Sequence, residues 1–268
     1  MKTLLLTLSL FVVTSLVYAQ DDPVLKRLEE SPRHHEWVKV KQGDREVHSF
    51  VVFPEVKDKK MVIIVIHENR GLNDWARGMA DQIAEAGYIA IAPDLLSGAG
   101  PNGGKTTDFE NSDAARTAIY ELEPNQVTSD LNAVYKYAKT ITAANGKVAV
   151  MGFCWGGSQT FRYATNNVGL EAAFVCYGGA PSQEDMSKIN APVYGFYGGN
   201  DARVNAGIPD AQSVMKANNK FYEPVIYDGA GHGFFRAGEM PDASPENAKA
   251  REEGLNRLKK ILADLDVN

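Results

Sequence analysis

The sequence predicts an α/β protein in which a mostly parallel, doubly wound sheet is flanked by helices. Short apolar runs rich in Val, Ile and Ala recur along the chain, as expected of strands that a parallel sheet buries on both faces. Helical patterns separate most of these runs, and strands that alternate with helices favour parallel crossover connections. No shift in composition marks a second domain, so we expect a single one.

The first elements are an antiparallel edge followed by a strand–helix unit. Residues 37–41 and 45–53 predict the two edge strands. The run MVIIVIHE at 61–68 is almost entirely apolar, which indicates a strand buried on both faces. We expect Asp74 to cap the helix that follows, and Gly87 to end it.

The alternation continues on both sides of a loop rich in Gly and Pro at 96–105. Further strands are predicted at 88–94, 146–153, 172–179, 192–199 and 222–229. Further helices are predicted at 114–122, 127–142, 156–164 and 211–217, and from about residue 245.

The amino-acid composition and net charge limit the kinds of molecule that this protein could bind. The chain of 268 residues, 44% of them hydrophobic, is long enough to bury one large core. Its net charge of −6 argues against nucleic acid or anionic lipid as the main partner. The sequence contains neither His-Glu-x-x-His nor Cys-x-x-Cys, so it predicts no metal ligands and no cofactor. We therefore expect a small-molecule partner, while the sequence indicates no oligomeric state.

The N-terminal residues predict export. Lys2 precedes an apolar run that ends in VYA, which is the layout of a signal peptide cleaved after Ala19. The alternative is an N-terminal membrane anchor, but the run is short for a span of about twenty apolar residues. We therefore expect a signal peptide at 1–19, an extension at 20–36 and one domain at 37–268. The product would be periplasmic or extracellular, without a stable membrane span.

The two cysteines have different contexts. An oxidising compartment would allow one disulfide between them. However, Cys154 lies in the Gly-rich stretch VMGFCWGGSQ, whereas Cys176 lies in an apolar strand. We expect Cys176 to be a buried free thiol, which behaves as a small hydrophobic group.

The stretch around Cys154 has the form Gly-x-nucleophile-x-Gly between a predicted strand and a predicted helix. Such a sharp turn lifts the nucleophile above the sheet, and glycines are needed because side chains there would strike the neighbouring strand and helix. The start of the helix would favour the thiolate of Cys154. The alternative is a buried thiol in a Gly-rich turn without catalysis.

A nucleophile needs a base, and the base needs an acid to orient it. His232 and Asp201 both follow predicted strands, at the edge where open α/β sheets bind ligands. With Cys154 they follow the chain order nucleophile, acid, histidine of the α/β-hydrolase fold. The alternative is that Asp201 caps a turn and His232 is solvated. Three other histidines precede the core sheet and are expected at the surface: His34, His35 and His48.

Five motifs together resemble the dienelactone hydrolase family over residues 60–262. They are HENRGL from His67, APDL from Ala92, GFCWGG from Gly152, GGNDARV from Gly198 and GAGHGFFR from Gly229. The resemblance implies an α/β-hydrolase fold and a Cys154–His232–Asp201 triad that hydrolyses esters or lactones through an acyl-enzyme. It also implies that Glu68 contacts the thiol and helps control its ionisation.

The resemblance further implies an oxyanion hole made by the backbone N–H groups of Trp155 and Asn69. Trp155 lies at the predicted helix start, where unsatisfied donors can point toward a developing oxyanion. The alternative role for Glu68 is a salt bridge with Arg70 or another basic group. His67 could be a rival base, but its place before Glu68 at the strand end favours packing.

The chain departs from the family pattern in two ways. Family members are usually cytosolic, whereas this chain is predicted to be exported. Dienelactone-specific members bind the substrate carboxylate with two arginines, of which one corresponds to Arg236. The second should follow APDL, where this chain has Leu96, Ser97 and Gly98. Lys105 could replace it, although a solvated loop lysine is expected.

We therefore expect a roomy rim at 97–105 and a broad hydrolase with a modest preference for a carboxylate. One alternative function is a general carboxylesterase that acts on larger acyl or sugar esters. The other is a non-catalytic binding protein with an α/β-hydrolase fold.

Overall fold

The computed structural model describes residues 23–267, which contain one eight-stranded sheet in the order β1-β2-β4-β3-β5-β6-β7-β8. β2 pairs antiparallel with β1 and β4, and the other neighbouring pairs are parallel. The predicted mostly parallel sheet with an antiparallel edge is confirmed. The strands are β1 (His34–Gln42), β2 (Arg45–Phe53), β3 (Lys60–Ile66), β4 (Ile89–Pro93), β5 (Ala144–Phe153), β6 (Ala173–Cys176), β7 (Val193–Gly198) and β8 (Tyr222–Tyr227).

Helices cover both faces of this sheet. They are α1 (Pro23–Glu29), α2 (Asp74–Glu85), α3 (Ser112–Tyr120), α4 (Pro124–Ala138), α5 (Trp155–Ala164), α6 (Gln183–Met186), α7 (Ala202–Asn205), α8 (Ile208–Ala217), α9 (Phe234–Ala237) and α10 (Pro245–Val267). Two short 3₁₀ helices are η1 (Pro101–Gly103) and η2 (Thr106–Asp108). Among the described residues no helix is long and apolar enough to cross a membrane.

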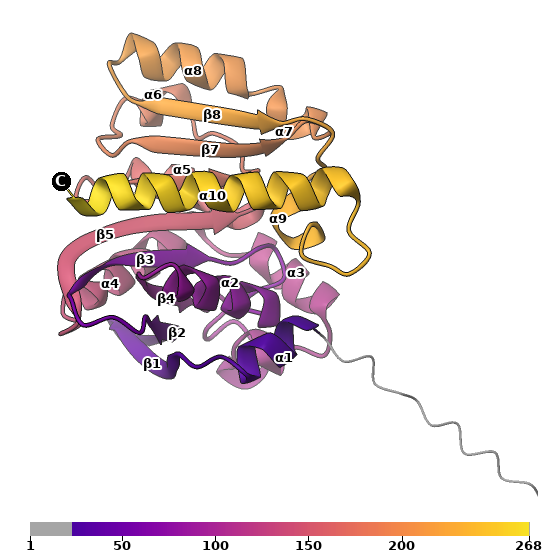
Figure 1. Cartoon of the computed structure of the whole chain (residues 1–268). Coiled ribbons are helices and arrows are strands. Elements are labelled where there is room, and N and C mark those ends of the chain that lie inside the picture. The colour runs from indigo at the N-terminus through magenta and orange to yellow at the C-terminus, as the bar shows by residue number, and fades with distance from the viewer. Residues whose placement is uncertain (1–22, 268) are drawn as a thin grey trace, which may run out of the picture.

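The core has two layers, one on each face of the sheet. Side chains of α1, α2 and α10 form one layer, and Figure 1 shows α10 and α2 in front of the sheet. Side chains of α4, α5 and α8 form the other. In β3, Ile63 and Val65 belong to the first layer, whereas Ile64 and Ile66 belong to the second. This double burial explains why the strand is apolar at every position after Lys60.

The N-terminal part of the fold differs from the prediction in detail. Helix α2 is capped by Asn73, whose side chain accepts a hydrogen bond from the Ala76 N–H at 3.0 Å, and Asp74 is the first helical residue. Strand β1 begins before residue 37, and α1 precedes it within the predicted extension. The predicted signal peptide lies outside the described residues, so export stays a prediction.

One buried carboxylate attaches this N-terminal segment to α2. Asp81 is fully buried and accepts hydrogen bonds from Ser31 at 2.6 Å, from Arg33 and from His35 at 2.8 Å. These bonds lower the pKa of Asp81 even though burial alone would raise it. His35 is therefore half-buried and hydrogen-bonded, and the expectation of a surface histidine is wrong at this position.

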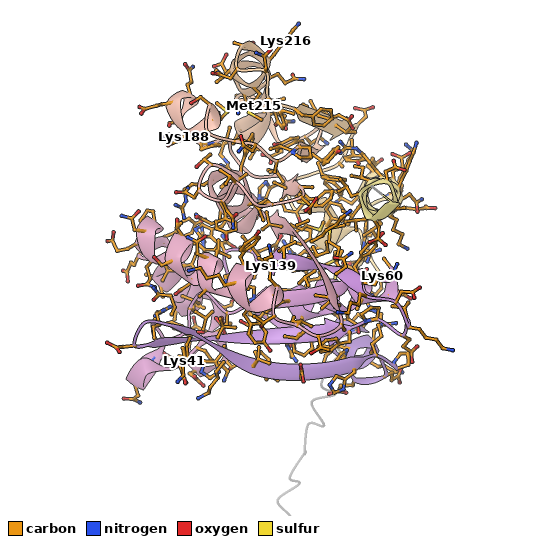
Figure 2. All side chains as sticks on the ribbon, turned by 90° about the vertical axis from the view of Figure 1, so that its left-hand side faces the viewer. Lys41, Lys60, Lys139, Lys188, Met215 and Lys216 are labelled. Atoms are coloured by element: carbon orange, nitrogen blue, oxygen red, sulfur yellow. The ribbon has the colours of Figure 1, made fainter. Side chains whose placement is uncertain are left out.

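The carboxyl ends of the parallel strands meet at one edge of the sheet. In Figure 1 the arrowheads of β5, β7 and β8 point to the right-hand side, where α3, α7 and α9 gather. Figure 2 looks at the opposite end, where the strands start and Lys60 is labelled at the beginning of β3. The residues singled out as catalytic follow strands β3, β5, β7 and β8, so the topology brings them to the same edge.

Candidate active site

Cys154 occupies a strained turn between β5 and α5. Its backbone has φ 57° and ψ −115°, a conformation that residues other than glycine rarely adopt. A Cβ atom at Gly152 would lie 2.3 Å from the Gly156 carbonyl oxygen, and one at Gly156 would lie 2.3 Å from the His67 carbonyl oxygen. The predicted need for glycines on both sides of the cysteine is confirmed.

Backbone hydrogen bonds hold the turn in place. The Cys154 N–H donates to the Cys176 carbonyl at 3.0 Å, and the Ser158 N–H donates to the Cys154 carbonyl at 3.1 Å. By contrast, the N–H groups of Trp155 and Asn69 donate to no acceptor among the described residues. Both N–H groups are therefore unpaired among the described residues, and their role as an oxyanion hole stays a prediction.

Asp201 and His232 are joined directly. His232 Nδ1 lies 2.5 Å from Asp201 Oδ2, and Asp201 is buried. Although Asp201 precedes α7, its side chain caps no backbone N–H there. The alternative in which Asp201 caps a turn and His232 is only solvated is therefore wrong.

The electrostatics of His232 connect it to the cysteine. A hydrogen bond to Cys154 raises the pKa of His232 most, burial lowers it, and the hydrogen bond to Asp201 raises it further, to about 9. The ring is therefore held between the sulfur and the carboxylate. Because Nδ1 faces Asp201, Nε2 is the nitrogen left for the thiol.

Glu68 follows β3 and forms an ion pair. Its Oε2 accepts a hydrogen bond from Arg236 Nε at 2.8 Å, and its Oε1 accepts one from the Tyr177 hydroxyl at 3.3 Å. The alternative of a salt bridge is thus realised, with Arg236 and not with Arg70. Among the described residues no hydrogen bond joins Glu68 to Cys154, so direct control of the thiol stays a prediction.

Arg236 lies in α9, four residues after His232, and its side chain is 48% exposed. Burial lowers its pKa, but the charge of Glu68 and the hydrogen bond between them outweigh burial and raise it. Arg236 lines the cavity of Cys154, and its Nε already donates a hydrogen bond to Glu68.

Tyr177 is a site residue that the sequence reasoning missed. It is buried, it has φ 40°, and its ring lies edge-on to His232 with centroids 5.1 Å apart. Burial and the nearby Glu68 raise the pKa of its hydroxyl well above the usual value, so Tyr177 remains a hydrogen-bond donor. It follows the last residue of β6, and the strand-end rule that selected Asp201 and His232 would have selected it too.

His67 has a structural role, as expected. Its ring is fully buried and stacks on Trp155 with centroids 5.6 Å apart. Nδ1 donates to the Glu68 carbonyl at 2.8 Å, and Nε2 accepts from the Leu95 N–H at 3.3 Å. Burial lowers the pKa of His67, so it holds the neutral tautomer and is not available as the base.

Both cysteines are free, and Cys176 is fully buried as predicted. Burial raises the pKa of the Cys176 thiol well above its usual value, which makes it unreactive. No group of three or more His, Cys, Asp or Glu side chains within residues 23–267 could hold a metal ion.

The sulfur and the imidazole open on a cavity of about 600 Å³. Its lining consists of Glu68, Asn69, Arg70, Asn73, Arg116, Tyr120, Cys154, Arg203, His232 and Arg236. A smaller cavity of about 160 Å³ adjoins it and shares Tyr120, Cys154, Arg203 and His232. Arginine thus dominates the charge of the lining, which the sequence reasoning did not foresee apart from Arg236.

The loop at 97–105 does not line this cavity, so the predicted roomy rim is wrong. The loop folds on itself because Gly98 and Gly100 donate to the Gly104 carbonyl at 2.8 and 3.1 Å. Buried Asp94 also accepts a hydrogen bond from the Thr106 hydroxyl at 2.7 Å. Lys105 lies outside the lining and does not replace the second arginine.

Known proteins of similar sequence and fold carry related names. A sequence model of the dienelactone hydrolase family matches residues 47–265. A Salmonella typhimurium protein named "Putative carboxymethylenebutenolidase" is 31% identical over 72% of this chain and 74% of its own length. A protein of the same name from Saccharolobus solfataricus is 29% identical over 81% and 93%. The crystal structure of a "Putative Dienelactone Hydrolase" from Klebsiella pneumoniae has a TM-score of 0.75 and 24% identity, covering 86% of this chain and 98% of that one.

Proposed function

This chain belongs to the dienelactone hydrolase family, and on that premise we propose that it hydrolyses ester or lactone bonds through an acyl-enzyme on Cys154. The observation that carries the proposal is the placement of His232 between Cys154 and Asp201. The contact of His232 Nδ1 with Asp201 at 2.5 Å, and the cavities that Cys154 and His232 line together, support a nucleophile with a proton carrier and an orienting carboxylate.

In the first step the Cys154 thiolate attacks the carbonyl carbon, so a C–S bond forms and the carbonyl electrons move to oxygen. The unpaired N–H groups of Trp155 and Asn69 would stabilise this oxyanion. When the oxyanion collapses, the ester C–O bond breaks and the protonated His232 gives its proton to the leaving alkoxide. The product is a thioester and, for a lactone, the leaving hydroxyl stays attached to it.

In the second step water replaces the alcohol. His232 Nε2 takes a proton from water as the oxygen attacks the thioester carbon, and collapse expels the Cys154 thiolate. Asp201 holds Nδ1 throughout, which keeps the ring in one tautomer and stabilises its protonated form. The acid is released and the thiolate–imidazolium pair is restored.

Arg236 is the proposed holder of a substrate carboxylate close to the reacting bond. A guanidinium can bind a carboxylate through charge-assisted hydrogen bonds. However, Arg236 Nε already donates to Glu68, so the substrate shares this arginine with Glu68. We therefore infer a broad specificity with a modest preference for a carboxylate at this position.

A general carboxylesterase remains the second candidate because the cavity continues beyond the triad. A further hollow of about 400 Å³ shares Gly179, Arg203 and Val204 with the smaller cavity. The three adjoining hollows would accommodate a larger acyl or alcohol group than a small lactone needs. A panel of lactones, short esters and sugar esters separates the two candidates by the substrate with the highest kcat/KM.

The test of the chemistry itself uses Cys154→Ala. The wild-type protein should hydrolyse an activated aryl ester and release a burst of alcohol equal to the enzyme when deacylation is slow. Alkylation of one thiol should abolish activity, because Cys176 is buried. Full activity in Cys154→Ala would refute the acyl-enzyme, and wild-type binding without turnover of any panel member would favour the non-catalytic alternative.

A further inference from the structure

Two arginines in the described chain have no protein partner. The sequence contains eleven arginines, all within residues 23–267. Nine of them donate hydrogen bonds or form ion pairs with other residues: Arg27, Arg33, Arg45, Arg70, Arg77, Arg162, Arg236, Arg251 and Arg257. Arg116 and Arg203 have neither among the described residues, and both line the cavity of Cys154.

These two arginines come from different elements at the same edge of the sheet. Arg116 lies on α3 one turn before Tyr120, so the two side chains share a face of the helix. Arg203 lies on α7, two residues after Asp201. Tyr120 and Arg203 line both the larger cavity and the smaller one, together with Cys154 and His232. A ligand at the sulfur would therefore have an arginine from each element beside it.

The other two arginines of the cavity lining, Arg236 and Arg70, are less available to bind an anionic ligand because they already have protein partners. Arg236 donates to Glu68 at 2.8 Å, and Arg70 contacts Ser112 at 3.3 Å and Asp113 at 3.9 Å. An anion that binds Arg236 must compete with Glu68, whereas one that binds Arg116 or Arg203 displaces only water. Because both are exposed, their donors remain hydrated until a ligand arrives.

The charge of the site opposes that of the whole protein. The chain carries a net charge of −6, yet four arginines and only one carboxylate other than the triad contribute to the cavity lining. A cleft of one sign concentrates ligands of the opposite sign and speeds their association. Such a reversal is expected where an enzyme must attract an anion.

We propose that Arg116 and Arg203 form an oxyanion-binding subsite separate from Arg236, which selects esters that carry a carboxylate or phosphate several bonds from the reacting carbonyl. This proposal rests on the proposed ester hydrolysis. In this arrangement the charged end of the substrate lies between α3 and α7, and the reacting carbonyl lies at Cys154.

The test compares two esters of equal chain length. Mono-4-nitrophenyl adipate carries a terminal carboxylate, and 4-nitrophenyl hexanoate does not. We expect wild-type protein to prefer the adipate in kcat/KM, and Arg116→Gln and Arg203→Gln each to lower the ratio of the two values about tenfold. Arg203→Lys should restore part of the ratio. Lys216→Gln is the matched control, because this exposed lysine near the end of α8 is labelled in Figure 2 at the end of the molecule away from the site.

The same variants show whether the subsite binds a carboxylate or a phosphate. They also test the subsite separately from the proposed ester hydrolysis. Competition by adipate and by inorganic phosphate against hexanoate hydrolysis shows which oxyanion binds, and Arg203→Gln should weaken that inhibition. The subsite proposal would be overturned if neither glutamine variant changed the preference for the adipate ester. It would also be overturned if the variants lowered kcat/KM equally for both esters. If wild type hydrolyses neither ester, the proposed function fails, but calorimetric binding of adipate to Cys154→Ala, weakened by Arg203→Gln, would still support the subsite. Binding that Arg203→Gln leaves unchanged would overturn it.

Discussion

Arg236 and Glu68 are hydrogen-bonded to each other at 2.8 Å beside Cys154. The residue proposed to hold the substrate carboxylate is thus the partner of the residue implied to control the thiol. Because Glu68 is buried and Arg236 is half-exposed, an anion that arrives from solvent meets Arg236 first. Substrate binding and the environment of Glu68 are therefore coupled through one guanidinium.

Removal of Arg236 tests this coupling. Arg236→Ala leaves the Glu68 carboxylate without its cation, and we expect the free energy of unfolding to fall by about 1 kcal/mol, a small value because the arginine is half-exposed. Adding Glu68→Gln should recover part of that loss. Chemical denaturation measures both variants, and Arg70→Ala is the control because its nearest carboxylate is 3.9 Å away.

The same variant tests substrate choice. We expect Arg236→Ala to lower the preference for a carboxylated lactone over its neutral analogue by roughly tenfold, the value of one charged hydrogen bond. The two kcat/KM values are measured for wild type and variant. A strong carboxylate preference that survives Arg236→Ala would show that the clamp lies elsewhere.

The triad should behave as one unit. His232→Ala removes the proton carrier and Asp201→Ala removes its orientation, so the double variant should be little slower than His232→Ala alone. Each single variant should lower kcat by about a hundredfold or more. Steady-state rates of the three variants give the answer. Losses that multiply in the double variant would mean that His232 and Asp201 act independently.

The raised pKa of His232 predicts an alkaline limit. Its pKa is about 9, so the imidazolium that protonates the leaving group is present below this pH and is lost as the pH rises through it. We expect kcat/KM for an alkyl ester to fall above about pH 9. Asp201→Asn should move the limit to lower pH, because Asp201 raises the pKa. A limit that stays in place in Asp201→Asn would contradict the assignment.

Export is proposed from the first nineteen residues alone. The charged start, the short apolar run and the small residues at its end predict cleavage after Ala19. N-terminal sequencing of the protein recovered from its native host should begin at Gln20. A membrane-bound product that still starts at Met1 would show that the segment is an anchor.

Much of the fold followed from local patterns in the sequence. Doubly buried strands such as β3 are apolar at every position after the first, and the longer helices are amphipathic, so the order of the strands and of these helices could be predicted. The short helices α1, α6, α7 and α9 were not predicted. The turn at Cys154 was also predictable, because the close approach of Gly152 and Gly156 to backbone oxygens excludes any other residue. Where predictions failed, as in the cap of α2 and the loop at 97–105, the outcome depended on hydrogen bonds that the side chains of Asn73 and Asp94 accept.

The sequence by itself determined the order of the strands and of the longer helices, the glycine turn that carries Cys154, and the strand-end positions of Asp201 and His232. Only the tertiary structure decided which charged groups meet. Glu68 and Arg236 are 168 positions apart, and their pairing depends on how the loop after β8 returns over β3. The packing also decides that, within residues 23–267, no carboxylate lies close enough to pair with Arg116 or Arg203. Periodicity reports which face of an element is buried, whereas contacts between distant loops depend on the packing of the whole sheet edge.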